Sequence, residues 1–133
     1  MLRFSMSKIK FDPEQATIEL FVTLKNKGET KRLLMVLDTG STFCTIPWKI
    51  AEALKIGDGM YEEKTEIFTA CGVEDVPLIK LESLSVDGEE RKVIEVVVHD
   101  LPQKSRVDGL LGLSFLRNFN LKIDFKSGWI EME

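Results

Sequence analysis

A chain of 133 residues, 44% of them hydrophobic and 30% charged, has room for one domain with a hydrophobic core and not for two. We therefore treat residues 1–133 as a single domain. The net charge of -4 argues against the basic surface that nucleic acids and anionic membranes attract, so we expect neither as a partner.

Compartment and cofactors follow from what the sequence lacks. No apolar run approaches the roughly 20 residues that span a bilayer, and residues 1–8 lack the uninterrupted apolar stretch of a signal peptide. We therefore expect a cytoplasmic protein in which Cys44 and Cys71 are reduced thiols. A single histidine, His99, excludes a multi-histidine metal site, and we expect no metal and no other cofactor. His99 ends a predicted strand, where we expect a hydrogen-bonded structural role.

Most of the chain predicts short β-strands. Apolar residues alternate with polar ones over residues 17–24, which places the apolar side chains on one face. Turn residues 26–28 lead to a strand over residues 31–37, whose continuously apolar end predicts burial on both faces. The other predicted strands are residues 43–46, 66–70, 77–86, 92–99, 108–112, 121–125 and 129–132.

Two short helices are expected between these strands. Pro47 is expected at the first position of a helix that ends at Gly57, because the missing N–H of proline costs nothing there. Ser114 is expected to cap a second helix that extends to Asn118. The whole pattern predicts a mostly β domain whose many short strands close into a barrel.

The segment Leu37-Asp38-Thr39-Gly40-Ser41 places a carboxylate directly after a buried strand. Burying a lone carboxylate is costly, and such features concentrate at functional sites. Gly40 allows main-chain N–H groups to approach the Asp38 oxygens, and Ser41 is expected to donate a hydrogen bond to one of them. Both contacts favour the ionised carboxylate, and the Ser41 hydrogen bond predicts a pH optimum on the acid side of neutral. The alternative is a loop carboxylate that only caps turn N–H groups.

This Asp-Thr-Gly-Ser loop between apolar strands resembles that of the aspartic proteases. In that family an apolar-apolar-Gly strand crosses beneath the catalytic loop and a short helix follows it. Gly109-Leu110-Leu111-Gly112 and residues 114–118 match both features, and residues 121–130 look like the family's closing strands. The resemblance extends from about Thr17 to the C-terminus and is closest to single-domain, retropepsin-like members. It implies one lobe of a closed acid-protease barrel with a flap hairpin, paired as a two-fold homodimer.

The resemblance also implies an aspartic endopeptidase that uses two facing carboxylates sharing one proton. The ionised carboxylate activates a water molecule, and the protonated one polarises the scissile carbonyl. The chain contains a single Asp-Thr-Gly and is too short for two lobes, so the second carboxylate would be Asp38 of another copy. Thr39 of each copy would brace the loops across the two-fold axis, and Gly40 and Ser41 complete the predicted catalytic loop.

Residues 65–81 stand where the family has its flap, the hairpin that folds over the substrate, and their tip is expected near Gly72. Glycine at the tip would permit close approach to a peptide and the bending that a lid requires. Cys71 beside it is expected to be a small apolar filler, with a redox gate as the alternative. The substrate would bind as an extended strand between flap and floor. The residues expected to contact it are Cys71, Gly72, Val73, Val36, Ile46 and Leu110.

Three positions depart from the viral members of the family. Thr42 and Leu113 stand where viral enzymes commonly carry a substrate-binding aspartate and an interface arginine, and Ser41 replaces the viral alanine. A second class of function is therefore a catalytically inactive retropepsin-fold module for dimerisation or peptide binding. The intact Asp-Thr-Gly-Ser favours the enzyme, because a binding module has little reason to keep a costly carboxylate pair.

Overall fold

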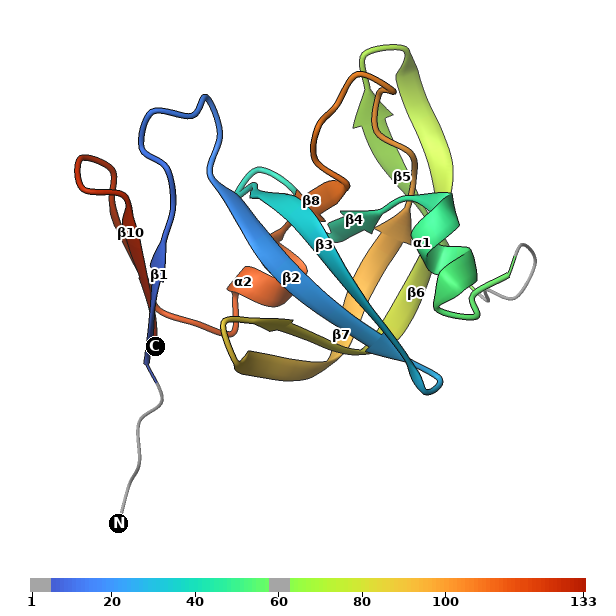
Figure 1. Cartoon of the computed structure of the whole chain (residues 1–133). Coiled ribbons are helices and arrows are strands. Elements are labelled where there is room, and N and C mark those ends of the chain that lie inside the picture. Colours follow the sequence, from blue (N-terminus) through green and yellow to red (C-terminus); the bar gives the residue numbers. More distant parts are fainter. Residues whose placement is uncertain (1–5, 58–62) are drawn as a thin grey trace.

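Two β-sheets make up most of the chain, which the computed structural model describes for residues 6–57 and 63–133 (Figure 1). Seven strands form one sheet in the order β2-β3-β8-β4-β7-β6-β5, and the other sheet has the order β1-β10-β9. The described elements are β1 (Ser7–Lys10), β2 (Glu19–Asn26), β3 (Glu29–Leu37), β4 (Cys44–Ile46), α1 (Trp48–Ala53), β5 (Glu63–Thr69), β6 (Gly72–Val86), β7 (Glu89–Val98), β8 (Gly109–Leu111), α2 (Leu113–Leu116), β9 (Leu121–Asp124) and β10 (Trp129–Met132).

A second pairing of β2, with β6 as well as β3, closes six strands of the large sheet into a barrel. The expected fold class, a mostly β barrel with two short helices, is confirmed. The barrel contains two parallel pairs, β3 with β8 and β4 with β7. The first of these pairs determines the position of the candidate site, because it brings the end of β3 beside the end of β8.

The β2–β3 hairpin shows how the alternating pattern builds the core. Its turn residues Lys27 and Gly28 both have positive φ, as a two-residue turn with the right-handed twist of the strands requires. The alternating apolar residues of β2 are buried, as predicted. The end of β3 differs from its prediction, since Leu33 and Met35 are buried but Leu34 and Val36 on the opposite face are half-buried. A continuous apolar run therefore overstated the burial of that face.

The β5–β6 hairpin is longer than predicted and turns earlier. Its turn lies at residues 70–71, and β6 already begins at Gly72. The sequence had predicted the hairpin tip at residues 71–75. Pro77 lies inside β6, opposite Lys64 of β5. It is tolerated there because β6 pairs with β7 only from Leu78 onward, so no ladder bond to β7 is lost at the proline.

Both helices begin and end differently from the predictions. Pro47 precedes α1 in an extended conformation, and the N–H of Trp48 is capped by Asp100 Oδ1 at 2.9 Å. The helix ends before Lys55, which takes positive φ, so Gly57 is not its terminator. Ser114 lies inside α2 and does not cap it, because its hydroxyl donates to the main-chain oxygen of Glu95.

The three-stranded sheet joins the two ends of the described chain. Strand β1 was not predicted, because its alternating lysines give it only one strongly apolar position, Ile9. It pairs with β10, which buries Ile130 and Met132. Residues 1–5, on which the expectation about a signal peptide partly rests, lie outside the described residues.

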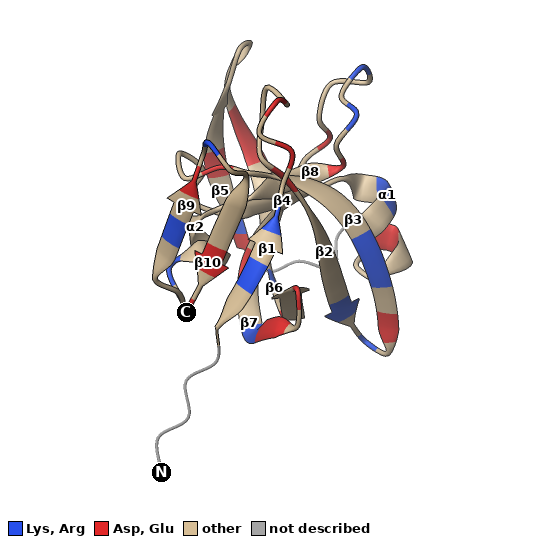
Figure 2. Cartoon of the chain, turned by 60° about the vertical axis from the view of Figure 1, so that its left-hand side comes forward, with Lys and Arg blue, Asp and Glu red and all other residues tan. Residues whose placement is uncertain are grey.

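Charged residues of both signs are interleaved over the surface. In the view of Figure 2, basic and acidic positions lie close together along the strands, and neither sign covers a whole face. Among the described residues, no helix has the length and hydropathy that crossing a membrane requires.

The sharp turn at Gly128 supports the three-stranded sheet and yields a stability prediction. Gly128 has φ +76°, and a Cβ there would overlap the main-chain oxygen of Phe11, whereas Gly28 has φ +80° and open space around it. Gly28→Ala should lower the free energy of unfolding by about 1–2 kcal/mol through backbone strain alone. Gly128→Ala should lower it by about 1–3 kcal/mol more, because the Phe11 main chain must also move. Urea unfolding of both variants measures the difference, and equal losses would contradict this packing.

Candidate active site

Asp38 lies in a tight loop directly after β3 and is half-buried. Its main-chain N–H donates to the oxygen of Leu111 at 3.0 Å, and its carboxylate Oδ1 accepts the N–H of Gly40 at 2.9 Å. The N–H of Ser41 donates to the main-chain oxygen of Asp38 at 3.2 Å. The expected approach of a main-chain N–H to the carboxylate is therefore present. The carboxylate is held in place by the main chain of its own loop.

The segment after β8 crosses beneath this loop and holds it by main-chain hydrogen bonds. Leu113 and Ser114 donate their N–H groups to the oxygens of Ser41 and Thr42 at 2.8 and 3.0 Å. The crossing is so close that a Cβ at Gly112 would overlap the oxygen of Phe43. Glycine is required at this position by the approach of two backbones, and this is the crossing that the apolar-apolar-Gly pattern implies.

Cys44 and Ser114 support the crossing from below, a role that the sequence did not reveal. The Ser114 hydroxyl donates to Glu95 O at 2.7 Å and accepts the N–H of Cys44 at 3.0 Å. The N–H of Gly112 points to Cys44 Sγ at 3.3 Å. Burial raises the pKa of the Cys44 thiol, which keeps it neutral. In the sequence Cys44 is only a small apolar residue in a strand, so nothing there predicts its contacts.

The predicted hydrogen bond from Ser41 to Asp38 is wrong for the single chain. The Ser41 hydroxyl donates to the main-chain oxygen of Phe43 at 2.8 Å, and it has no second proton to donate. It therefore stabilises the loop rather than the carboxylate. The acid pH optimum that was inferred from this bond loses that support. Thr39, expected to brace a partner loop, is exposed at the surface of the single chain.

Two apolar grooves lie on either side of the loop at residues 99–108. The first, about 620 Å³, separates this loop from the β5–β6 hairpin and is bordered by Ser41 and Cys71. The second, about 640 Å³, lies between the loop and the start of β2 and is bordered by Val36. Leu110 lies on the floor of both grooves. Both therefore open at β8, the strand that pairs with β3, and the Asp38 loop follows β3 directly.

The remaining predicted contact residues lie elsewhere. Ile46 is completely buried in the core, so its prediction as a pocket residue is wrong. All three residues of its strand, β4, are buried, and the short apolar run gave no means of distinguishing core from pocket. Gly72 and Val73 are exposed on the β5–β6 hairpin and border neither groove.

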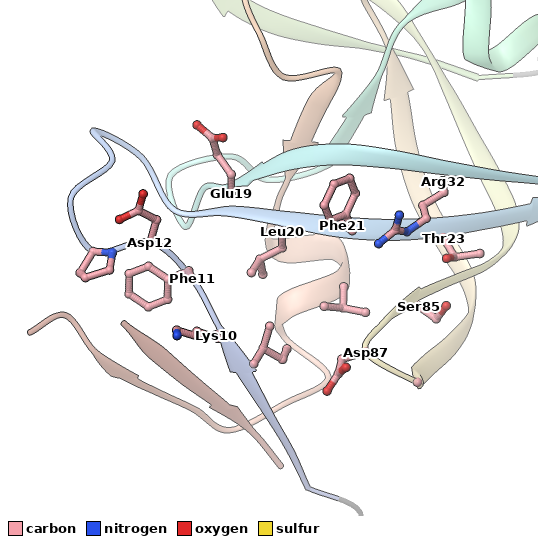
Figure 3. A pocket seen from close by; sticks show the side chains of 14 residues that line it. Lys10, Phe11, Asp12, Glu19, Leu20, Phe21, Thr23, Arg32, Ser85 and Asp87 are labelled. Carbon is pink, nitrogen blue, oxygen red and sulfur yellow. The ribbon is translucent and has the colours of Figure 1, made fainter. Parts of the chain in front are cut away.

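A larger cavity, about 890 Å³, lies between β1 and β2 and includes no residue of the Asp38 loop (Figure 3). Arg32 stacks on the exposed ring of Phe21 at 3.9 Å within it. Lys10, Asp12 and Asp87 also border it, so its charges are mixed. Size alone does not make it the candidate site, because it contains no arrangement of reactive groups comparable with the Asp38 loop.

An ion pair holds the loop at residues 99–108 against β2. Arg106 donates through Nε and Nη2 to the two carboxylate oxygens of Glu19, a two-point contact with defined geometry. The hydrogen bond from Arg106 lowers the pKa of Glu19. Because this loop forms a wall of both grooves, the pair helps to fix their width.

The lowered pKa of Glu19 predicts how its contribution depends on pH. A carboxylate with a depressed pKa in the folded state adds stability above its unfolded pKa, and this stability is lost as pH falls through the folded value. Glu19→Gln should therefore lower the free energy of unfolding at pH 7, and the gap to wild type should shrink below about pH 4.5. Thermal unfolding at several pH values measures the gap, and a gap independent of pH would show that the charge contributes nothing.

Comparison with known proteins agrees with this geometry. Residues 24–118 match the sequence model of a family described as "gag-polyprotein putative aspartyl protease". The fold is similar to the crystal structure of a retropepsin-like aspartic protease from Rickettsia conorii, with a TM-score of 0.70 and 21% identity over 97% of this chain and 99% of that one. No curated protein matches the chain in sequence. Because the family match covers most of the chain, the protein belongs to this family of aspartyl proteases and has the retropepsin-like fold.

Proposed function

We propose that the protein is an aspartic endopeptidase that acts as a homodimer, in which each copy contributes Asp38 to one catalytic pair. The observation that carries the proposal is the Asp38 loop itself. Its carboxylate is fixed by the N–H of Gly40, and the loop is clamped from below by Leu111 and Leu113. A clamp of this kind fixes the position of a carboxylate without neutralising it, as a catalytic acid–base group requires.

The stoichiometry of the chemistry supports the dimer. One chain supplies a single Asp-Thr-Gly, while the reaction needs one ionised and one protonated carboxylate. Thr39 and Gly40 are exposed beside Asp38, so this side of the loop is accessible to a second copy. A two-fold axis at this point would place two identical loops face to face, which is the self-complementary contact of a symmetric dimer.

The proposed reaction moves protons between the pair and the substrate. The ionised Asp38 takes a proton from a water molecule, whose oxygen attacks the scissile carbonyl carbon. The protonated Asp38 of the other copy donates its proton to the carbonyl oxygen, and a tetrahedral diol forms. Collapse of the diol breaks the C–N bond: the first carboxyl group gives its proton to the leaving amine, and a diol hydroxyl returns its proton to the second carboxylate. The pair then again shares one proton.

The substrate is proposed to bind as an extended strand. The β5–β6 hairpin would act as the flap, with Cys71, Gly72 and Val73 at and next to its turn. The two grooves beside the residue 99–108 loop offer space for apolar side chains on either side of the scissile bond. Main-chain pairing would supply affinity independent of sequence, and the grooves would supply the preference for side chains.

The proposal predicts that activity depends on Asp38. Asp38→Asn removes the acid–base group while preserving shape, so cleavage of an unfolded protein should fall by about 10²- to 10⁴-fold. Pepstatin, which mimics the tetrahedral intermediate, should inhibit the wild type. Product formation should be followed across roughly pH 3 to 8, where shared-proton pairs titrate on the acid side.

The matched control is Asp87→Asn, which makes the same chemical change in an exposed turn where Asn tolerates the positive φ of Asp87. This variant should retain full activity. If the wild type and Asp38→Asn are equally inactive while both sediment as dimers, the chain is instead a non-catalytic dimerisation or peptide-binding module.

A further inference from the structure

The outer part of the β5–β6 hairpin makes few backbone contacts with the barrel. The ladder between β5 and β6 runs from Glu63 to the turn, but β6 pairs with β7 only from Leu78 onward. The part of the hairpin between its turn and Pro77 therefore projects past the end of the barrel sheet, and Figure 1 shows this hairpin at the top of the molecule. Pro77 and Val76 are buried and fix the base. Such a hairpin can move away from the barrel and open locally, through its own β5–β6 ladder, while the barrel hydrogen bonds stay intact.

A side-chain ion pair links this projecting segment to the barrel. His99 Nδ1 lies 3.5 Å from Glu74 Oε2. Glu74 lies two residues after Gly72, where β6 begins next to the hairpin turn. The barrel side of the pair is firmly held, because the N–H of His99 donates to Ile46 O at 3.0 Å. The next residue, Asp100, caps the N–H of Trp48 at 2.9 Å. The histidine is thus a fixed point, and Glu74 is on the part that can move.

Other charged groups face the same region. Lys64 and Asp75 border a cavity of about 450 Å³ together with His99 and Glu74. Asp100 borders the neighbouring groove, again with His99 and Glu74. The side chains of His99 and Glu74 are 30% and 47% exposed, so solvent weakens their attraction. The pair is therefore weak enough to shift an equilibrium between two hairpin positions, and it does not keep the hairpin closed permanently.

We propose that Glu74 and His99 are positioning residues that hold the hairpin over the groove when His99 is protonated and release it when the imidazole is neutral. The consequence for catalysis rests on the proposed function, in which the hairpin covers the substrate. Histidine changes charge between about pH 5 and 8, so the hairpin is closed more often in acid. Loss of the charge replaces an ion pair by a weaker neutral contact and shifts the balance by up to about fivefold.

Hydrogen exchange tests the hairpin directly and needs no proteolysis. The starting protein is Asp38→Asn, which removes self-cleavage from the measurement. Exchange of the amides in residues 65–76 is measured by mass spectrometry at pH 5 to 8 and corrected for the intrinsic rate at each pH. We expect the corrected opening of the hairpin to increase about two- to fivefold from the acid to the neutral end.

Four variants in the same background identify the cause. His99→Gln and Glu74→Gln should each abolish this pH dependence, and the double variant should behave like either single one. Glu66→Gln removes the same charge from an exposed position of β5 and should keep it. A pH dependence that survives His99→Gln, or that Glu66→Gln abolishes equally, would overturn the proposal.

A kinetic comparison then connects the hairpin to the site. In the chain with Asp38 intact, His99→Gln should raise KM about two- to fivefold at pH 5, leave it unchanged at pH 8 and alter kcat less. An unchanged KM at pH 5 would separate the ion pair from substrate binding and overturn its positioning role. If no proteolysis is found but the exchange pattern is as expected, the hairpin mechanism holds and the proposed function fails.

Discussion

The fold of the candidate site depends on one close crossing of two backbones. The chain after β8 passes beneath the Asp38 loop and forms hydrogen bonds with its main-chain atoms on both sides of the carboxylate. Gly109 and Gly112 make the crossing possible, because a Cβ on either would overlap a main-chain oxygen of Thr45 or Phe43. Since main-chain groups make these bonds, the loop keeps its shape while the carboxylate side chain stays available for chemistry.

A single chain holds only half of the proposed catalytic site. The loop fixes one carboxylate well, but the two grooves border Leu110 and not Asp38 itself. The cavity of about 890 Å³ between β1 and β2 lies away from it. A second copy, placed with its loop against the first, would supply the missing acid and a second set of grooves. Function in this account is thus a property of the pair, and the hairpin adds control over access to it.

The sequence predicted those features that depend on local pattern. The turn at residues 26–28 and the alternation along β2 require particular residue types, so they could be found from the sequence. The apolar-apolar-Gly crossing was implied by the resemblance to the aspartic proteases. Predictions that needed tertiary context were less reliable. The Ser41 hydroxyl has two possible acceptors, and only the folded loop shows that Phe43 O is the nearer choice. Ile46 is a core residue because its strand lies inside the barrel, paired with β7 and β8, and β1 forms because β10 offers it an edge.

A subunit-mixing experiment tests the central claim, that one site contains Asp38 from two copies. Wild type and Asp38→Asn are unfolded together, refolded as mixtures, and assayed at constant total protein. If both carboxylates are needed in one dimer, activity falls with the square of the wild-type fraction, to about one quarter in an equal mixture. Activity that falls in direct proportion to the wild-type fraction, to about one half, would mean that each chain acts alone and would contradict the shared site.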